Sequence, residues 1–99
     1  MNKDLQRLST IFSSDDMNRI TASEDGLQVD LHGKSRHEAK VFINNIINLI
    51  NHPFVLDIIH GYNRGTVLKQ MIYKEKINSR IVSRTGVRYN MGETFLMVA

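Results

Sequence analysis

Two segments of this 99-residue chain share one pattern, an apolar run that ends in a histidine and a glycine and precedes a helix-forming stretch. The first is Val29-Asp30-Leu31-His32-Gly33 and the second is Ile58-Ile59-His60-Gly61. Two apolar runs with a helix between them predict parallel strands joined by a right-handed crossover. Because parallel strands end at the same edge of a sheet, we expect both histidines at one edge, where open sheets bind their ligands.

The remaining periodicity completes one domain. Alternating apolar residues predict a strand at 27–31, and the nearly continuous apolar run at 54–59 is typical of an inner strand. A helix is expected after Ser35, because Ser35 and Glu38 have the spacing of a capping box, and it ends before Pro53. Further elements are predicted as a helix over 66–77 and strands over 79–84 and 94–98, with a loop at 85–93. The order βαβαββ predicts an α+β (α/β two-layer) fold with a four-stranded mixed sheet, two helices on one face and an antiparallel last strand.

Residues 1–26 are predicted to be an N-terminal tail ahead of a domain at 27–99. Leu5, Leu8 and Phe12 have helical spacing, so a short amphipathic helix is expected over about residues 3–13. Residues 17–26 are expected to be a linker. We expect the helix to pack on the domain, and the alternative is an arm that docks a partner.

Composition limits the class of protein. With 41% hydrophobic and 23% charged residues, the chain is typical of a globular protein. It has no cysteine, so disulfide and thiolate chemistry are excluded and any metal would need histidine and carboxylate ligands. No apolar run reaches the roughly 18 residues of a membrane span, and Met1-Asn2-Lys3-Asp4 does not resemble a signal peptide. We therefore expect a cytoplasmic monomer that does not bind membranes.

Charge is distributed unevenly along the chain. Residues 1–31 carry a net charge of −3 and residues 32–99 a net charge of +6, within a total of +3. A basic body of this size favours a polyanionic partner, first of all nucleic acid. The alternative is a basic surface that is merely solvated.

Three residues at the expected sheet edge are candidate catalytic groups. His32 and His60 can act as acid or base near neutral pH, and Asp30 can orient or charge His32. Together they suit acid–base chemistry on a phosphodiester. The alternative is structural: each histidine forms hydrogen bonds at a strand end, and Asp30 satisfies backbone donors of the following turn. Asp57, within the inner strand, is expected to pair with a basic residue of a neighbouring strand.

A second set of residues is expected to bind nucleic acid. Glycine lets backbone N–H groups approach a phosphate, and helix starts near Ser35 and Thr66 offer further donors. Arg64 and Arg88 can clamp phosphate oxygens, while Tyr89 can stack on a base. The loop at 61–65 lacks the ending of a Walker motif, so nucleotide hydrolysis is not expected. The full predicted set is Gly33, Lys34, Ser35, Arg36, Gly61, Asn63, Arg64, Gly65, Thr66, Arg84, Arg88, Tyr89 and Asn90.

These motifs resemble those of the Smr domain, the small MutS-related domain. Val29-Asp30-Leu31-His32-Gly33 with Glu38-Ala39 is similar to its LDLHG…EA motif, and Ile58-Ile59-His60-Gly61 with Gly65 and Leu68 to its second motif. Asn90-x-Gly92-x-Thr94 matches a weaker third feature, so the resemblance covers residues 27–99. The second motif usually has glycine where this chain has Asn63. Asparagine tolerates positive φ, so the turn is compatible with it, while its backbone donors are re-aimed.

The resemblance implies a sheet similar to the C-terminal domain of bacterial translation initiation factor three, with the last strand inserted between strands two and three. It also implies binding to branched or single-stranded nucleic acid and, in several members, endonuclease activity on DNA or RNA, including messenger RNA on colliding ribosomes. That activity maps onto Asp30, His32, His60 and Gly61 here.

We therefore expect an Smr-type endonuclease acting on RNA or on single-stranded or branched DNA. One histidine would be the base and the other the acid, and no cofactor is required. A divalent Mg or Mn ion held by Asp30 and His32 is an open alternative with few ligands. Two other functions are a nucleic-acid-binding module without catalysis, and a ribosome-associated module whose residues 1–26 dock a protein partner.

Overall fold

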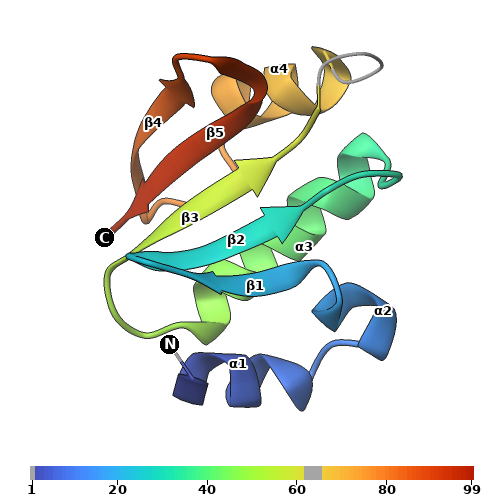
Figure 1. The fold of residues 1–99 in the computed structure, drawn as a ribbon, viewed down its shortest axis with the longest axis vertical. Helices are drawn as coiled ribbons and strands as arrows, with labels where there is room; N and C mark the ends of the chain where they lie inside the picture. The colour runs from blue at the N-terminus through green and yellow to red at the C-terminus, as the bar shows by residue number, and fades with distance from the viewer. Residues whose placement is uncertain (1, 62–65) are drawn as a thin grey trace.

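The computed structural model describes residues 2–61 and 66–99, and their fold is mixed α and β, as predicted (Figure 1). The five-stranded sheet has the order β1-β2-β3-β5-β4, so the expected count of four strands is wrong by one. The helices are α1 (Asn2–Ser9), α2 (Ser14–Met17), α3 (Arg36–Leu49) and α4 (Thr66–Lys74). The strands are β1 (Ile20–Ser23), β2 (Gly26–Asp30), β3 (Phe54–Ile59), β4 (Ile81–Val87) and β5 (Asn90–Val98). None of the helices in these two ranges has the length and apolar character needed to cross a membrane.

Strand directions in the sheet agree with those expected from the crossover rule. β2 and β3 are parallel, with Asp30 opposite Ile59. β5 lies between β3 and β4 and is antiparallel to both, with Glu93 opposite Ile59 on the β3 side. The carboxyl ends of β2 and β3 and the start of β5 therefore meet at one edge of the sheet.

The core lies between the sheet and α3 and α4, which cover the same face (Figure 1). Alternate residues of β2 and β3 point into it, and the apolar stripe of α3 packs against them. The predicted capping box starts α3: the Ser35 hydroxyl accepts the Glu38 N–H at 3.2 Å, and the Glu38 carboxylate accepts the Ser35 N–H at 2.9 Å. Fully buried members of this core include Leu27, Val29, Leu31, Ile43, Ile46, Ile47, Leu56, Ile58 and Leu96.

Residues 20–23, which the sequence predicts to be part of a linker, form β1 at the edge of the sheet. β1 pairs antiparallel with β2, and Ile20, opposite Val29, is buried. The expected packing of the first helix is confirmed, because Leu8 is fully buried and the Phe12 ring meets the Phe42 ring edge-on at 5.1 Å. The N-terminal segment is therefore part of the same fold. The sequence pattern does not reveal β1 because only one of its four residues is buried.

The loop expected at 85–93 is a β-hairpin. β4 extends to Val87 and β5 begins at Asn90, so the turn consists of Arg88 and Tyr89 alone. Between Thr85 and Glu93 the hairpin buries no residue except Gly92 and shows no apolar alternation. Other ends also differ from prediction: β2 covers Gly26–Asp30, α1 stops at Ser9, α4 stops at Lys74 and β4 starts at Ile81.

None of the described basic residues pairs with Asp57, contrary to expectation. It is 5% exposed, its Oδ2 accepts the Gln28 side-chain N–H at 2.9 Å, and its Oδ1 has no hydrogen-bond partner among the described residues. The strands on either side place Gln28 and Phe95 opposite it, so no cation is in register. The Asp57 carboxylate and burial instead raise the pKa of Glu93 to about 7.

Candidate functional site

The two His-Gly turns meet at the carboxyl edge of β2 and β3, as the repeated pattern predicts. Leu31 donates its N–H to the Ile59 carbonyl at 2.9 Å, so the parallel pairing continues to the end of both strands. Gly33 and Gly61 have φ of +81° and +71°, a conformation that side chains rarely adopt. Glycine is thus required at both turns for backbone reasons.

The β4–β5 hairpin closes against the second turn. His60 and Gly61 both donate their N–H groups to the Gly92 carbonyl, at 2.8 and 3.0 Å. A Cβ on Gly92 would lie 3.1 Å from Gly61 Cα, so a side chain at position 92 would crowd the second turn. The Gly61 N–H, expected to face a phosphate, is therefore engaged within the fold.

His60 is buried, with 3% of its surface exposed, and both ring nitrogens have partners. Nδ1 lies 2.7 Å from the Gly61 carbonyl oxygen, which can only accept, so Nδ1 carries the proton. Nε2 then accepts from the Thr94 hydroxyl at 2.9 Å, and Thr94 accepts from the Tyr73 hydroxyl at 3.1 Å. Burial lowers the pKa of His60, which favours this neutral ring. His60 thus makes the hydrogen bonds expected of a structural histidine at a strand end.

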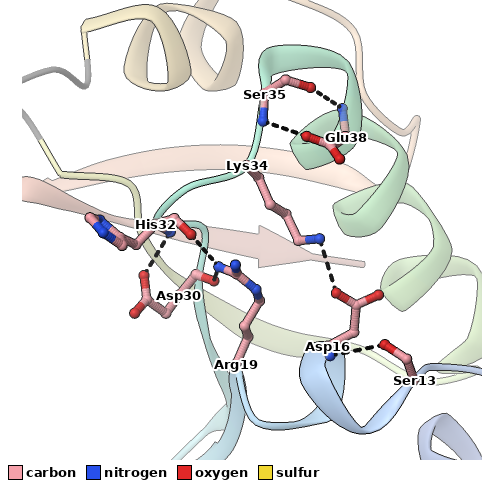
Figure 2. A network of polar contacts seen from close by, with 8 residues as sticks. All are labelled: Ser13, Asp16, Arg19, Asp30, His32, Lys34, Ser35 and Glu38. Carbon is pink, nitrogen blue, oxygen red and sulfur yellow. Dashed lines mark hydrogen bonds and ion pairs between the residues drawn. The ribbon is translucent and has the colours of Figure 1, made fainter.

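The pleat of the strands directs the two histidines to different sides. Asp30 and Ile59 are opposite each other and share one face, so His60, the next residue of β3, turns to the face covered by α4. His32 is exposed, and its side chain lies beside that of Asp30 (Figure 2). The expectation that both rings reach one substrate group is therefore wrong. The backbones of His32 and His60 lie at the same sheet edge, but their rings lie on opposite faces of the sheet.

Asp30 binds the backbone of the turn rather than the His32 imidazole. Its Oδ1 accepts the His32 N–H at 2.8 Å (Figure 2). We refer to the exposed Asp30 and His32 side chains at the end of β2 as the Asp30/His32 corner. Asp30 thus does what the structural alternative expected of it, satisfying a backbone donor of the following turn, and the His32 imidazole is directed to solvent.

Arg19 is the residue at this corner that the sequence did not reveal. Its Nη1 donates to the carbonyl oxygens of Asp30 at 3.0 Å and His32 at 2.5 Å. Its own carbonyl accepts the Asp30 N–H at 2.9 Å. The only signal that could have identified it is the pairing of Ile20 with Val29, which places Arg19 beside Asp30.

Several basic residues expected to bind nucleic acid make contacts within the fold. Lys34 pairs with Asp16 at 3.0 Å and lies over the Phe42 ring. Arg36 forms an ion pair with Glu75 across α3 and the end of α4 while its own side chain stays largely exposed.

Arg84 lies away from the site. Its Nε donates to the Ile72 carbonyl at 2.6 Å, and it stands opposite Leu96, which is itself opposite Leu56. Leu56 precedes His60 by four residues, so Arg84 is about 13 Å below the edge along the strands. Its expected position beside the histidines is therefore wrong.

The hairpin tip carries the other predicted residues into solvent. Tyr89 is 90% exposed and Arg88 lies over its ring at 5.5 Å. Asn90 accepts the Gly92 N–H at 3.0 Å and so shapes the start of β5. Thr66 is exposed at the start of α4. Asn63, Arg64 and Gly65 lie outside the described residues.

Within the described part of the chain, no group of three histidine, aspartate or glutamate side chains is arranged to hold a metal ion. Comparison with known proteins adds no assignment: no protein-family model matches the chain, and no curated protein matches it.

Proposed function

We propose that this chain is an Smr-type domain that binds single-stranded or branched nucleic acid and cleaves it at the Asp30/His32 corner. One observation carries the proposal: an exposed imidazole stands at the end of β2, where two left-handed glycine turns and an arginine–tyrosine hairpin come together at one sheet edge. Ligands of open sheets with parallel strands bind at this edge. The positive charge of residues 32–99 favours a polyanion there.

In this mechanism His32 is the general base. On RNA it takes the proton of a 2′-hydroxyl, whose oxygen attacks the adjacent phosphorus, and the 5′-oxygen of the next nucleotide leaves with a proton from water. On DNA, which lacks that hydroxyl, His32 activates a water molecule. Asp30 holds the backbone of His32, and His60 holds the neighbouring turn through the Gly61 carbonyl.

Binding uses the hairpin tip. The Tyr89 ring is free to stack on an unpaired base, and the Arg88 guanidinium beside it can bond a phosphate oxygen. Base stacking of this kind tolerates any sequence, so we expect selectivity for unpaired structure rather than for a motif.

A second candidate is a nucleic-acid-binding module without catalysis. The burial of His60 favours it, because the second imidazole of an acid–base pair is enclosed between Thr94 and Gly61. The engaged N–H of Gly61 favours it too, since one expected phosphate donor is already used.

The test incubates the protein with end-labelled single-stranded RNA, single-stranded DNA and branched duplex, in EDTA and separately in Mg²⁺ or Mn²⁺. His32→Ala is compared with His37→Ala, which removes an exposed histidine from the first turn of α3. We expect His32→Ala to lose about 100-fold or more of the cleavage rate, the usual contribution of a general base. His37→Ala is expected to match the wild type.

Equal cleavage by His32→Ala and the wild type would refute the assignment of His32. Salt-dependent binding with no product from any substrate would select the binding module. Cleavage in EDTA would exclude a required divalent ion.

A further inference from the structure

We propose that Arg19 is a positioning residue for the Asp30/His32 corner, so that residues 13–19 are part of the site. The proposal rests on the proposed function, because it concerns how the same corner is held. It changes the functional unit from residues 27–99 to one that includes the N-terminal segment.

Arg19 holds the main chain on both sides of Leu31. A single amino group, Nη1, donates to the Asp30 carbonyl at 3.0 Å and to the His32 carbonyl at 2.5 Å. The first carbonyl belongs to Asp30, the last paired residue of β2, and the second lies two residues beyond the strand. Hydrogen bonds from a charged donor are the stronger kind, so one side chain fixes the relative orientation of two peptide groups.

Arg19 also fixes Asp30 through its own backbone. Asp30 donates its N–H to the Arg19 carbonyl at 2.9 Å, so the N–H and carbonyl of Asp30 both bond to Arg19. The Asp30 carboxylate then accepts the His32 N–H at 2.8 Å. The chain of contacts thus leads from Arg19 through Asp30 to the backbone that carries the imidazole (Figure 2).

The guanidinium lies along the glycine of the turn as well. A Cβ on Gly33 would be 3.9 Å from Arg19 Nη2, so Arg19 borders the residue whose φ of +81° reverses the chain. The Arg19 side chain therefore lies along the whole turn from Asp30 to Gly33.

A second contact ties the same N-terminal segment to the turn. Asp16 pairs with Lys34 at 3.0 Å and accepts the Arg19 N–H on its carbonyl at 3.1 Å. The Ser13 hydroxyl accepts the Asp16 N–H at 3.2 Å and caps α2 (Figure 2). Arg19 is thereby presented by a short folded segment.

Loss of Arg19 should affect turnover more than binding. Among the described residues, the Arg19 side chain bonds to the backbone of His32 and forms no hydrogen bond with the hairpin tip, which we expect to hold the nucleic acid. A reacting group misplaced by about 1 Å can lose about 100-fold in rate. We therefore expect kcat to fall and KM to stay near its wild-type value.

The experiment compares Arg19→Met with Arg7→Met. Arg7 is a matched control because it also lies in the N-terminal segment and donates to a backbone carbonyl, that of Leu49 at 3.2 Å, away from the corner. Both variants lose one positive charge and side-chain hydrogen bonding to the backbone, which is to two carbonyls for Arg19 and to one for Arg7. Three quantities are measured: the ring resonances of His32 and the amide resonance of Gly33 by NMR, the affinity for single-stranded RNA, and kcat and KM for its cleavage.

For Arg19→Met we expect shifted or broadened His32 and Gly33 resonances, RNA affinity within about twofold of the wild type, and kcat reduced by about tenfold to 100-fold. Arg19→Lys, which keeps a charged donor, should recover part of kcat and should be used if the methionine variant does not fold. Wild-type resonances and kcat in Arg19→Met, indistinguishable from Arg7→Met, would overturn the proposal. If the wild type cleaves nothing, the proposed activity fails, while the resonances still decide whether Arg19 holds the corner.

Discussion

The Thr94 hydroxyl on β5 lies 2.9 Å from Nε2 of His60 at the end of β3. Because the Gly61 carbonyl fixes the proton of this ring on Nδ1, Thr94 must be the donor in the bond. Tyr73 on α4 donates in turn to Thr94, so three elements are joined through one fully buried threonine. This chain holds the second His-Gly turn at the sheet edge.

Removing the Thr94 hydroxyl should destabilise the fold. In Thr94→Val the shape is kept while Nε2 of the buried His60 and the hydroxyl of Tyr73 lose a partner, so we expect a loss of about 1–3 kcal/mol in the free energy of unfolding. Urea denaturation measures it. Thr85→Val, at an exposed position of β4, is the control and should change stability by less than about 0.5 kcal/mol. An equal loss in both variants would contradict the hydrogen-bond chain.

The charge state of His60 gives a second prediction. Burial lowers its pKa below the ordinary value of 6.5, so the folded state favours the neutral ring. Between the folded pKa and 6.5 the unfolded chain binds more protons. The contribution of His60 to stability is therefore complete above pH 6.5 and is lost as the pH falls towards the folded pKa.

NMR titration of the histidine rings checks this directly. The His60 ring should carry its proton on Nδ1 at pH 7.5 and should titrate at lower pH than a model histidine. In Thr94→Val the same ring loses its partner on Nε2 and its tautomer should no longer be fixed. A His60 ring that carries a proton on both nitrogens at pH 7 would contradict the assignment.

The sequence predicted the parts of the fold that have strong apolar periodicity. The β2 and β3 runs and the stripe of α3 are long enough to be read without knowledge of their neighbours. β1 was not predicted because Ile20 is its one buried residue. Its pairing with β2 becomes evident only from the register that sets Ile20 opposite Val29. The β4–β5 hairpin was not predicted for a similar reason, since the residues near its tip are not buried in the core.

At the site, backbone positions were predictable and side-chain directions were not. The repeated His-Gly pattern placed His32 and His60 at one edge. Which face each ring takes depends on the register that sets Asp30 opposite Ile59, and a change of one residue would reverse it. The role of Arg19 was hidden by the same lack of register, because it depends on the position of β1.

The N-terminal helix should contribute to global stability. Leu8 is fully buried against the core, so Leu8→Ala should cost about 2–4 kcal/mol, whereas Ile11→Ala, at a side chain that is mostly exposed, should cost less than about 0.5 kcal/mol. Urea denaturation of both variants gives the comparison. A single cooperative transition is expected, because β1 follows α1 and α2 into the same sheet. A Leu8→Ala protein as stable as Ile11→Ala would contradict the packing of α1.

The carboxyl pair on the open side of the sheet gives the last prediction. The pKa of Glu93 is raised to about 7, first because its protonated form can donate a hydrogen bond to Asp57, and further by burial and by the negative charge of the Asp57 carboxylate. The folded state therefore favours protonated Glu93, which can donate to the Asp57 Oδ1 that otherwise has no partner among the described residues. This stabilisation is present below pH 4.5, the unfolded value, and is lost as the pH rises through about 7.

Glu93→Gln replaces the titrating group by an amide that donates at every pH. At pH 8 the variant should be more stable than the wild type by about 1 kcal/mol, since Glu93 is partly exposed and water screens its interaction with Asp57. At pH 5, where wild-type Glu93 is already protonated, the two proteins should unfold at nearly the same urea concentration. The control is Asp30→Asn, which neutralises another carboxylate on the same face of the sheet. Asp30 already accepts the His32 N–H, so this variant should not gain stability at pH 8. A Glu93→Gln variant whose advantage is the same at pH 5 and pH 8 would mean that Glu93 does not share a proton with Asp57.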